Sequence, residues 1–314
     1  MTMLRSYLDS HAGVLSAAAA GESLGLSSTD LRRLVAQAVL TRVCRGGYVD
    51  AALLAEAGPE HAHRLRLRAV LSTSPTSLAA SHQSAAVLLG LPLLAADLDQ
   101  VHVSRRAGTG HGRRRGAFTI HACPGDDAAF RQIDGVWSVG PVAAILGAVL
   151  QCGEIGAQGV TDAALRAKVV TRDELEGGLA AMSGVPKVGQ ARQVVRRADP
   201  SAESVGESGL RVLLEILGYR VRPQVLIRDN GKAVARVDFY LPDLGVVVEF
   251  DGAVKYAGAD GRDALVAEKR REDRLRRLGL AVVRITWSQL YRPDLIRELV
   301  DAAALASLRR PGRQ

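Results

Sequence analysis

The chain has few aromatic residues, few cysteines and no histidine in its last part. Aromatic residues are 4% of its 314 residues, and no apolar run approaches the roughly 20 residues that a membrane-spanning helix needs. The three cysteines, Cys44, Cys123 and Cys152, never form a C-x-x-C pair, which excludes a disulfide framework and a cysteine-type zinc site. The first residues lack the apolar core of a signal peptide. These absences predict a cytoplasmic protein with no membrane association.

Basic residues exceed acidic ones, 41 against 33, which gives a formal net charge of +8. Most of them are arginines, whose planar guanidinium group suits phosphate oxygens, so nucleic acid is the first candidate partner. Hydrophobic residues make up 47% of the chain, which argues against general disorder. The length predicts two or three domains, each with its own core.

The first 56 residues predict a winged helix-turn-helix. Residues 14–25 and 28–40 favour two short helices joined by a tight turn, and residues 41–50 favour a β-hairpin that bends at Gly46-Gly47. In such a domain the second helix enters a DNA major groove. The exposed positions include four arginines, Arg32, Arg33, Arg42 and Arg45. The alternative is a small helical cap on the next domain.

Residues 57–198 predict a mixed α/β middle domain. We expect helices over 81–90 and 138–151, strands over 101–106 and 117–123, and two or three later helices over 161–198 that break at Gly177-Gly178 and at 184–186. Between the two strands lies AGTGHGRRRG, a glycine-rich loop. Its arginines and two that precede it could follow a phosphate backbone: Arg105, Arg106, Arg113, Arg114 and Arg115. The alternative is a solvated loop. The small, polar stretch 199–208 is the candidate linker.

The last part of the chain places carboxylates on neighbouring strands. We expect a helix over 204–217, strands over 220–228, 233–241 and 245–250, a helix over 262–278 and a strand over 280–286. The turn Asp229-Asn230-Gly231 between alternating segments is a strong hairpin signal. Asp238 then lies on the strand next to the one that carries Glu249 and Asp251.

Three carboxylates held this close need a cation among them. All seven histidines lie at or before His121, so only oxygen ligands are available, which favours Mg²⁺ or Mn²⁺. Such an ion activates a water for phosphodiester hydrolysis. Lys255 could assist, and Lys269 is a second candidate if its helical stripe faces the sheet. The alternative is a set of surface acids paired with arginines such as Arg236 and Arg284.

The stretch RVDFYLPDLGVVVEFDGAVKY, followed by EKRREDRLRRLGLAVVRITWSQL, resembles the PD-(D/E)XK nuclease superfamily in its branch related to very-short-patch-repair endonucleases. The resemblance implies a mixed sheet flanked by helices, with Asp238 and Glu249 as metal ligands. It places Glu207 behind these ligands or on a metal-bound water. Asp251 occupies the position where the superfamily usually has lysine, so that role would shift to Lys255 or Lys269.

The first part of the chain resembles a second family. HAGVLSAAAAGESLGLSSTDLRRLV, RGGYVD and ASHQSAAVLLGLP are similar to AbiEi-type antitoxins, winged-helix regulators that bind DNA and commonly repress a toxin operon. The resemblance implies a cognate toxin protein as a partner. Winged-helix regulators and nucleases often read symmetric sites, which suggests a homodimer, although no heptad pattern marks an interface.

Together these observations predict an α/β (α+β) multidomain protein. It would have a winged helix-turn-helix over 1–56, an AbiEi-like middle domain over 57–198, and a restriction-endonuclease-like domain over 199–314. The predicted function is Mg²⁺-dependent cleavage of DNA. The alternative is a non-enzymatic repressor or antitoxin of a type IV toxin-antitoxin system, in which the nuclease fold is degenerate.

Overall fold

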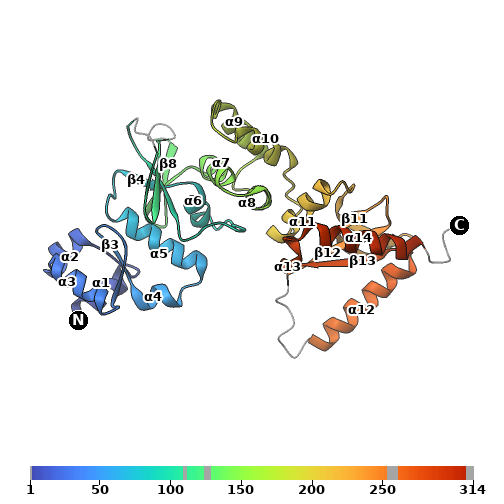
Figure 1. Ribbon diagram of the computed structural model, residues 1–314, viewed down its shortest axis with the longest axis horizontal. Coiled ribbons are helices and arrows are strands. Elements are labelled where there is room, and N and C mark those ends of the chain that lie inside the picture. The colour runs from blue at the N-terminus through green and yellow to red at the C-terminus, as the bar shows by residue number, and fades with distance from the viewer. Residues whose placement is uncertain (1, 109–111, 124–128, 253–260, 309–314) are drawn as a thin grey trace. The chain divides into compact units, whose positions relative to one another are not determined.

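The computed structural model describes residues 2–108, 112–123, 129–252 and 261–308 (Figure 1). Within these residues, the strands form three separate sheets, and helices lie between them along the chain. The chain divides into two compact units. Unit 1 is Met1–Gly153 with Lys168–Arg196, and unit 2 is Glu154–Ala167 with Arg197–Gln314. Over the described residues, no helix combines the length and apolar character needed to cross a membrane.

The start of unit 1 is a small sheet packed with helices. The elements are α1 (Thr2–Ser10), β1 (Val14–Ser16), α2 (Ala17–Leu24), α3 (Ser28–Ala36), β2 (Leu40–Cys44) and β3 (Gly47–Asp50). Strand order is β1-β3-β2, and the predicted hairpin is confirmed. The helix predicted from residue 14 begins only at Ala17, because residues 14–16 pair with β3 and Ser16 then caps α2 through its hydroxyl.

A six-stranded sheet forms the rest of the core of unit 1, in the order β6-β7-β5-β4-β9-β8. Its strands are β4 (Leu78–Ala80), β5 (Val101–Arg105), β6 (Arg113–Arg115), β7 (Phe118–His121), β8 (Phe130–Ile133) and β9 (Val136–Val139). The helices of this part are α4 (Ala51–Glu56), α5 (Pro59–Leu71), α6 (His82–Leu88), α7 (Pro141–Gln151), α9 (Arg172–Ala181) and α10 (Val188–Arg197).

Two predictions for this part are wrong. The arginines 113–115 were expected in a loop, but they form the edge strand β6, whose backbone pairs with β7 while the charged side chains stay exposed. Helix α9 continues through Gly177-Gly178 instead of breaking there. Gly178 packs so closely on α7 that a Cβ atom would lie 2.6 Å from Val142 Cγ1, so this glycine serves a helix contact.

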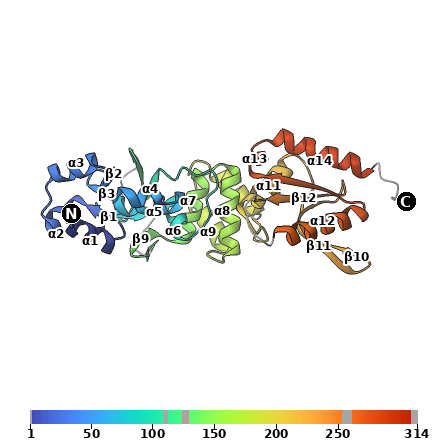
Figure 2. The ribbon, with the colours of Figure 1, turned by 90° about the horizontal axis from the view of Figure 1, so that it is seen from below.

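Unit 2 is built on a four-stranded mixed sheet of order β10-β11-β12-β13. Its elements are α8 (Glu154–Arg166), α11 (Val205–Ile216), β10 (Arg222–Asp229), β11 (Lys232–Leu241), β12 (Val246–Asp251), α12 (Gly261–Arg277), β13 (Ala281–Thr286), α13 (Trp287–Leu290) and α14 (Pro293–Leu308). Strands β10 to β12 are antiparallel, and β12 and β13 are parallel, joined through α12. In Figure 2, α12 and α14 lie on opposite sides of β12 and β13.

Helices α8 and α11 pack together around a buried ion pair. Asp162 is fully buried, and its carboxylate accepts hydrogen bonds from Gln158 Nε2 at 2.8 Å, from the Asp199 backbone N–H at 2.8 Å and from Arg211 at 3.1 Å. Arg211 is itself buried and also contacts Glu215. The carboxylate thus ties the segment after α10 to two helices.

Candidate functional site

The antiparallel pairing of β11 with β12, the next strand along the chain, brings Asp238 and Glu249 to adjacent positions. Phe239 pairs with Val248, so Asp238 and Glu249 are the next residues outward along the two strands. The Asp238 carboxylate accepts the backbone N–H of Phe250 at 2.9 Å. Burial and, to a smaller extent, the nearby charges of Glu207 and Glu249 raise the pKa of Asp238 to about 6, against the opposing effects of the Phe250 N–H and Arg271. This carboxyl group therefore takes up a proton at a higher pH than an exposed aspartate does.

Glu207 lies close behind Asp238, in the first turn of α11. It is buried and accepts hydrogen bonds of 2.9 Å from the Glu203 N–H, the Ser204 hydroxyl and the side-chain amide of Gln224. Gln224 lies on β10 between the paired positions Pro223 and Val225, opposite Asp238, and its φ of 51° is left-handed. A non-glycine residue in that conformation is uncommon and is often found at a functional site. The sequence had not singled out Gln224.

Glu249 is buried among arginines. Its carboxylate accepts Arg271 at 2.5 Å and pairs with Arg284 at 3.6 Å. Both arginines also contact Glu268, at 3.0 and 2.5 Å. The sequence allowed an alternative to a metal site, in which the acids pair with arginines such as Arg284, and Glu249 makes that ion pair. Arg236 pairs instead with Glu203, at 2.8 Å.

The helix α12 turns only part of the predicted stripe toward the sheet. Lys269 is exposed, so the prediction is wrong for this residue, whereas Glu272 of the same stripe pairs with Arg284 on β13 at 3.1 Å. The buried Leu275 sets the helix rotation, and Glu268, Arg271 and Glu272, which lie seven, four and three residues before it, share its face. Asp251 is half-buried at the end of β12, opposite Thr286. Lys255 lies outside the described residues.

The donor chemistry of this site consists of carboxylates, which fits Mg²⁺ or Mn²⁺. Within the part of the chain that the structure describes, no group of three or more His, Cys, Asp or Glu residues is placed so that it could hold a metal ion. Asp238 and Glu249 are two carboxylates, and Mg²⁺ is commonly bound through one or two while it keeps several waters. The two carboxylates therefore suit such an ion in their chemistry, while Arg271 already pairs with Glu249.

The predicted nucleic-acid-binding arginines are all in unit 1 and differ in their surroundings. Arg106 stacks on Trp137, with its guanidinium carbon 3.7 Å from the ring centre, and donates to the Thr76 carbonyl at 3.3 Å. Arg105 is half-buried at the end of β5, and Arg32 donates to Ser28 and Thr29 of its own helix. The remaining predicted arginines are exposed: Arg33, Arg45, Arg113, Arg114 and Arg115. Arg106 therefore has an intramolecular role.

No protein-family model matches the chain. Two uncharacterized proteins of Mycobacterium tuberculosis, from strains CDC 1551 / Oshkosh and H37Rv, are each 31% identical over 132 residues, or 42% of this chain and 48% of the relative. The chain thus spans about half the length of the curated relatives that it matches. Among solved structures, the catalytic domain of the homing endonuclease I-Bth0305I is 16% identical, with coverage of 33% of this chain and 96% of that chain. Its TM-score of 0.26 is too low to establish a shared fold.

Replacing Asp238 with asparagine is expected to stabilise unit 2 at neutral pH. The folded-state pKa of about 6 lies above that of an exposed aspartate, so folding disfavours the charged form at pH 7. The amide removes that charge while its oxygen can still accept the Phe250 N–H. We expect a gain of about 1–2 kcal/mol, because solvent screens part of the effect. The gain should shrink as the pH falls from 6 to 4, where wild type becomes protonated.

Urea denaturation at pH 7.5 and pH 4.5 measures this difference, and the exposed Asp243, changed to asparagine, is the matched control. A D238N variant that is less stable than wild type at pH 7.5 would contradict the raised pKa.

Proposed function

We propose that unit 2 is a metal-dependent endonuclease domain that hydrolyses phosphodiester bonds in DNA. The observation that carries the proposal is the placement of Asp238, which is half-buried next to Glu207 and Glu249 and has a pKa of about 6. Folding to a state that disfavours this charge costs stability, and such perturbed carboxylates are concentrated at functional sites. The sequence resemblance to PD-(D/E)XK nucleases supports the same assignment.

Asp238 and Glu249 are the proposed ligands of Mg²⁺ or Mn²⁺, and Asp251 is a third candidate. The bound ion would polarise the scissile phosphate and lower the pKa of a water. The hydrogen bond from Gln224 to Glu207 joins β10 to α11 next to Asp238. Arg271 and Arg284 orient the Glu249 carboxylate, and Arg271 must share or release it when an ion binds. Lys255 is the proposed assisting cation, and the exposed Lys269 is a weaker candidate.

The ion pairs of Glu249 favour a second candidate. Two arginines already neutralise this carboxylate, and Asp251 stands where the nuclease superfamily usually has lysine. A nuclease fold kept for binding alone would look this way. In this candidate the protein is a non-enzymatic repressor or antitoxin that binds DNA through a winged helix formed by α2, α3 and the β2–β3 hairpin. A toxin protein and a second copy of the chain remain predicted partners.

Cleavage assays separate the two candidates. Supercoiled, linear and single-stranded DNA would be incubated with the protein in Mg²⁺, in Mn²⁺ and in EDTA. For the nuclease we expect cutting that requires the metal and that falls at least about 100-fold in an Asp238→Ala, Glu249→Ala variant, the scale on which losing one electrostatic stabiliser of a transition state acts. A matched control removes two exposed acids of the same unit, Asp243→Ala with Glu298→Ala.

Each outcome bears on one candidate. Cutting that persists in the double variant, or that needs no metal, removes Asp238 and Glu249 from the reaction. If wild type and variant both bind DNA and neither cuts it, the repressor or antitoxin candidate is the better one.

A further inference from the structure

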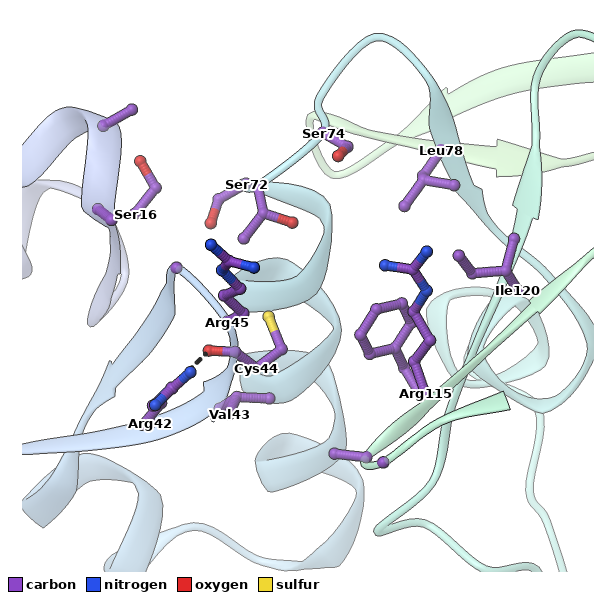
Figure 3. A pocket seen from close by; sticks show the side chains of 17 residues that line it. Ser16, Arg42, Val43, Cys44, Arg45, Ser72, Ser74, Leu78, Arg115 and Ile120 are labelled. Atoms are coloured by element: carbon purple, nitrogen blue, oxygen red, sulfur yellow. Dashed lines mark hydrogen bonds between the residues drawn. The ribbon is translucent and has the colours of Figure 1, made fainter. Parts of the chain in front are cut away.

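Unit 1 contains a cavity of about 720 Å³ whose wall is formed mainly by four separate segments, with Leu78 of β4 and Ile120 of β7 in addition (Figure 3). These segments are the start of α2, the β2–β3 hairpin, the residues after α5, and the turn between β6 and β7. Their lining residues are Ser16–Ala18, Arg42–Gly46, Ser72–Ser74 and Arg115–Phe118. The volume lies within the range of about 300–1,000 Å³ that is usual for small-molecule sites.

The wall is strongly basic. Arg42, Arg45 and Arg115 all line it, and the lining residues include no aspartate or glutamate. In Figure 3, Arg45 and Arg115 lie on opposite sides of the cavity, and Ser72 and Ser74 lie above them in this view. Within the described residues, the side chains of Arg45 and Arg115 make no hydrogen bond or ion pair, whereas Arg42 donates to the Cys44 carbonyl at 3.3 Å. These three positive charges, two from the hairpin and one from β6, repel one another and attract an anion.

The rest of the wall matches a ligand that is only partly charged. Hydroxyl groups come from Ser16, Ser72, Thr73 and Ser74, and each hydroxyl can donate to or accept from a bound group. Apolar side chains complete the wall: Val43, Leu78, Phe118 and Ile120. Guanidinium groups bind phosphate oxygens through paired hydrogen bonds, and apolar and aromatic side chains contact a sugar or base.

We propose that this cavity binds a nucleotide, with its phosphate group held by Arg45, Arg115 and Arg42 and its sugar or base against the apolar wall. The nucleotide is either free or the phosphorylated end of a nucleic-acid strand. The cavity belongs to unit 1 and requires no chemistry from the carboxylates of unit 2. It therefore stands or falls independently of the proposed nuclease activity.

Binding measurements on the full chain test this assignment. The probes are AMP, followed by calorimetry, and a fluorescent DNA oligonucleotide with either a 5′-phosphate or a 5′-hydroxyl. The cavity variant is Arg45→Glu with Arg115→Glu. The matched control is Arg131→Glu with Arg192→Glu, two exposed arginines of the same unit that do not line the cavity. We expect wild type and control to bind alike and the cavity variant to bind at least about tenfold more weakly, since charged hydrogen bonds are lost.

Cys44 supplies a second readout that needs no variant. Its thiol lies in the cavity wall, and burial raises its pKa, so alkylation by a maleimide is measured at alkaline pH. A bound nucleotide should slow the labelling of Cys44 and leave that of Cys123, which does not line the cavity, unchanged.

The arms distinguish the two sources of the phosphate. Binding of AMP with protection of Cys44 identifies a free nucleotide, and binding of the 5′-phosphorylated strand alone, over its 5′-hydroxyl form, identifies a strand end. Equal binding by the cavity variant and the control overturns the proposal, as does the absence of binding of every probe to wild type.

Discussion

Replacing Asp162 with alanine is expected to lower the free energy of unfolding of unit 2 by about 3–5 kcal/mol. The carboxylate is fully buried between α8 and α11, where it faces the buried Arg211 at 3.1 Å. Its removal leaves the Arg211 charge in a low-dielectric interior, where Glu215 is its one remaining ionic partner among the residues that the structure describes. It also leaves Gln158 Nε2 and the Asp199 N–H without their acceptor.

Two variants make this experiment specific. The chain has two tryptophans, Trp137 in unit 1 and Trp287 in unit 2, so a Trp137→Phe background lets fluorescence in urea report on unit 2. Changing Asp162→Leu together with Arg211→Met should recover much of the loss, because replacing both charges with apolar groups is often neutral. The exposed Asp243→Ala is the control. A loss below about 1 kcal/mol for Asp162→Ala would show that water reaches the pair.

Lowering the pH from 7 to 4.5 is expected to destabilise unit 1 by about 3 kcal/mol through three histidines. His82 stacks on His121 with ring centres 3.6 Å apart, and His102 Nδ1 lies 2.9 Å from His121 Nε2. Burial lowers the pKa of His102 and His121 to about 4 and that of His82 well below its usual value. Between pH 6.5 and 4 the unfolded chain binds protons that the folded cluster excludes, so stability is full above 6.5 and falls with pH.

The expected loss is smaller than three fully buried histidines would give, because His82 and His121 are partly exposed and solvent screens their charges. Trp137 fluorescence in a Trp287→Phe background follows unit 1 alone.

A His121→Phe variant, which keeps a ring against His82, should weaken the pH dependence, and the exposed His61→Gln should not. The raised pKa of Asp238 acts in the opposite direction in unit 2 as the pH falls to 4. Equal acid sensitivity of His121→Phe and wild type would exclude the cluster as the cause.

The sequence predicted the strands of unit 2 within a few residues. Alternating apolar residues and the Asp229-Asn230-Gly231 turn define β10 and β11, and the valines at 246–248 define a buried strand, so the neighbourhood of Asp238 and Glu249 followed from the hairpin. Alternation is a local signal, and it needs no knowledge of what packs on the sheet.

The partners of these acids could not be predicted in the same way. Arg271 contacts Glu249 from α12, a helix so polar that its pattern does not define the buried face, and the rotation depends on where Leu275 packs. Gln224 donates to Glu207 from a position with a left-handed backbone conformation. No glycine beside it in the sequence indicates that conformation. The basic cavity of unit 1 combines Arg42 and Arg45 of the β2–β3 hairpin with Arg115 of β6. Arg115 lies about 70 positions further along the chain, so these side chains meet only after folding.

The path of the chain between the two units limits how the gene can be divided. Because α8 belongs to unit 2 although residues 168–196 return to unit 1, the polypeptide passes from one unit to the other three times. A plasmid that encodes only residues 199–314 would therefore produce Arg211 without Asp162 and α11 without its neighbour α8. Such a fragment should be insoluble or degraded when expressed, and a single recombination event could not transplant unit 2 intact into another protein.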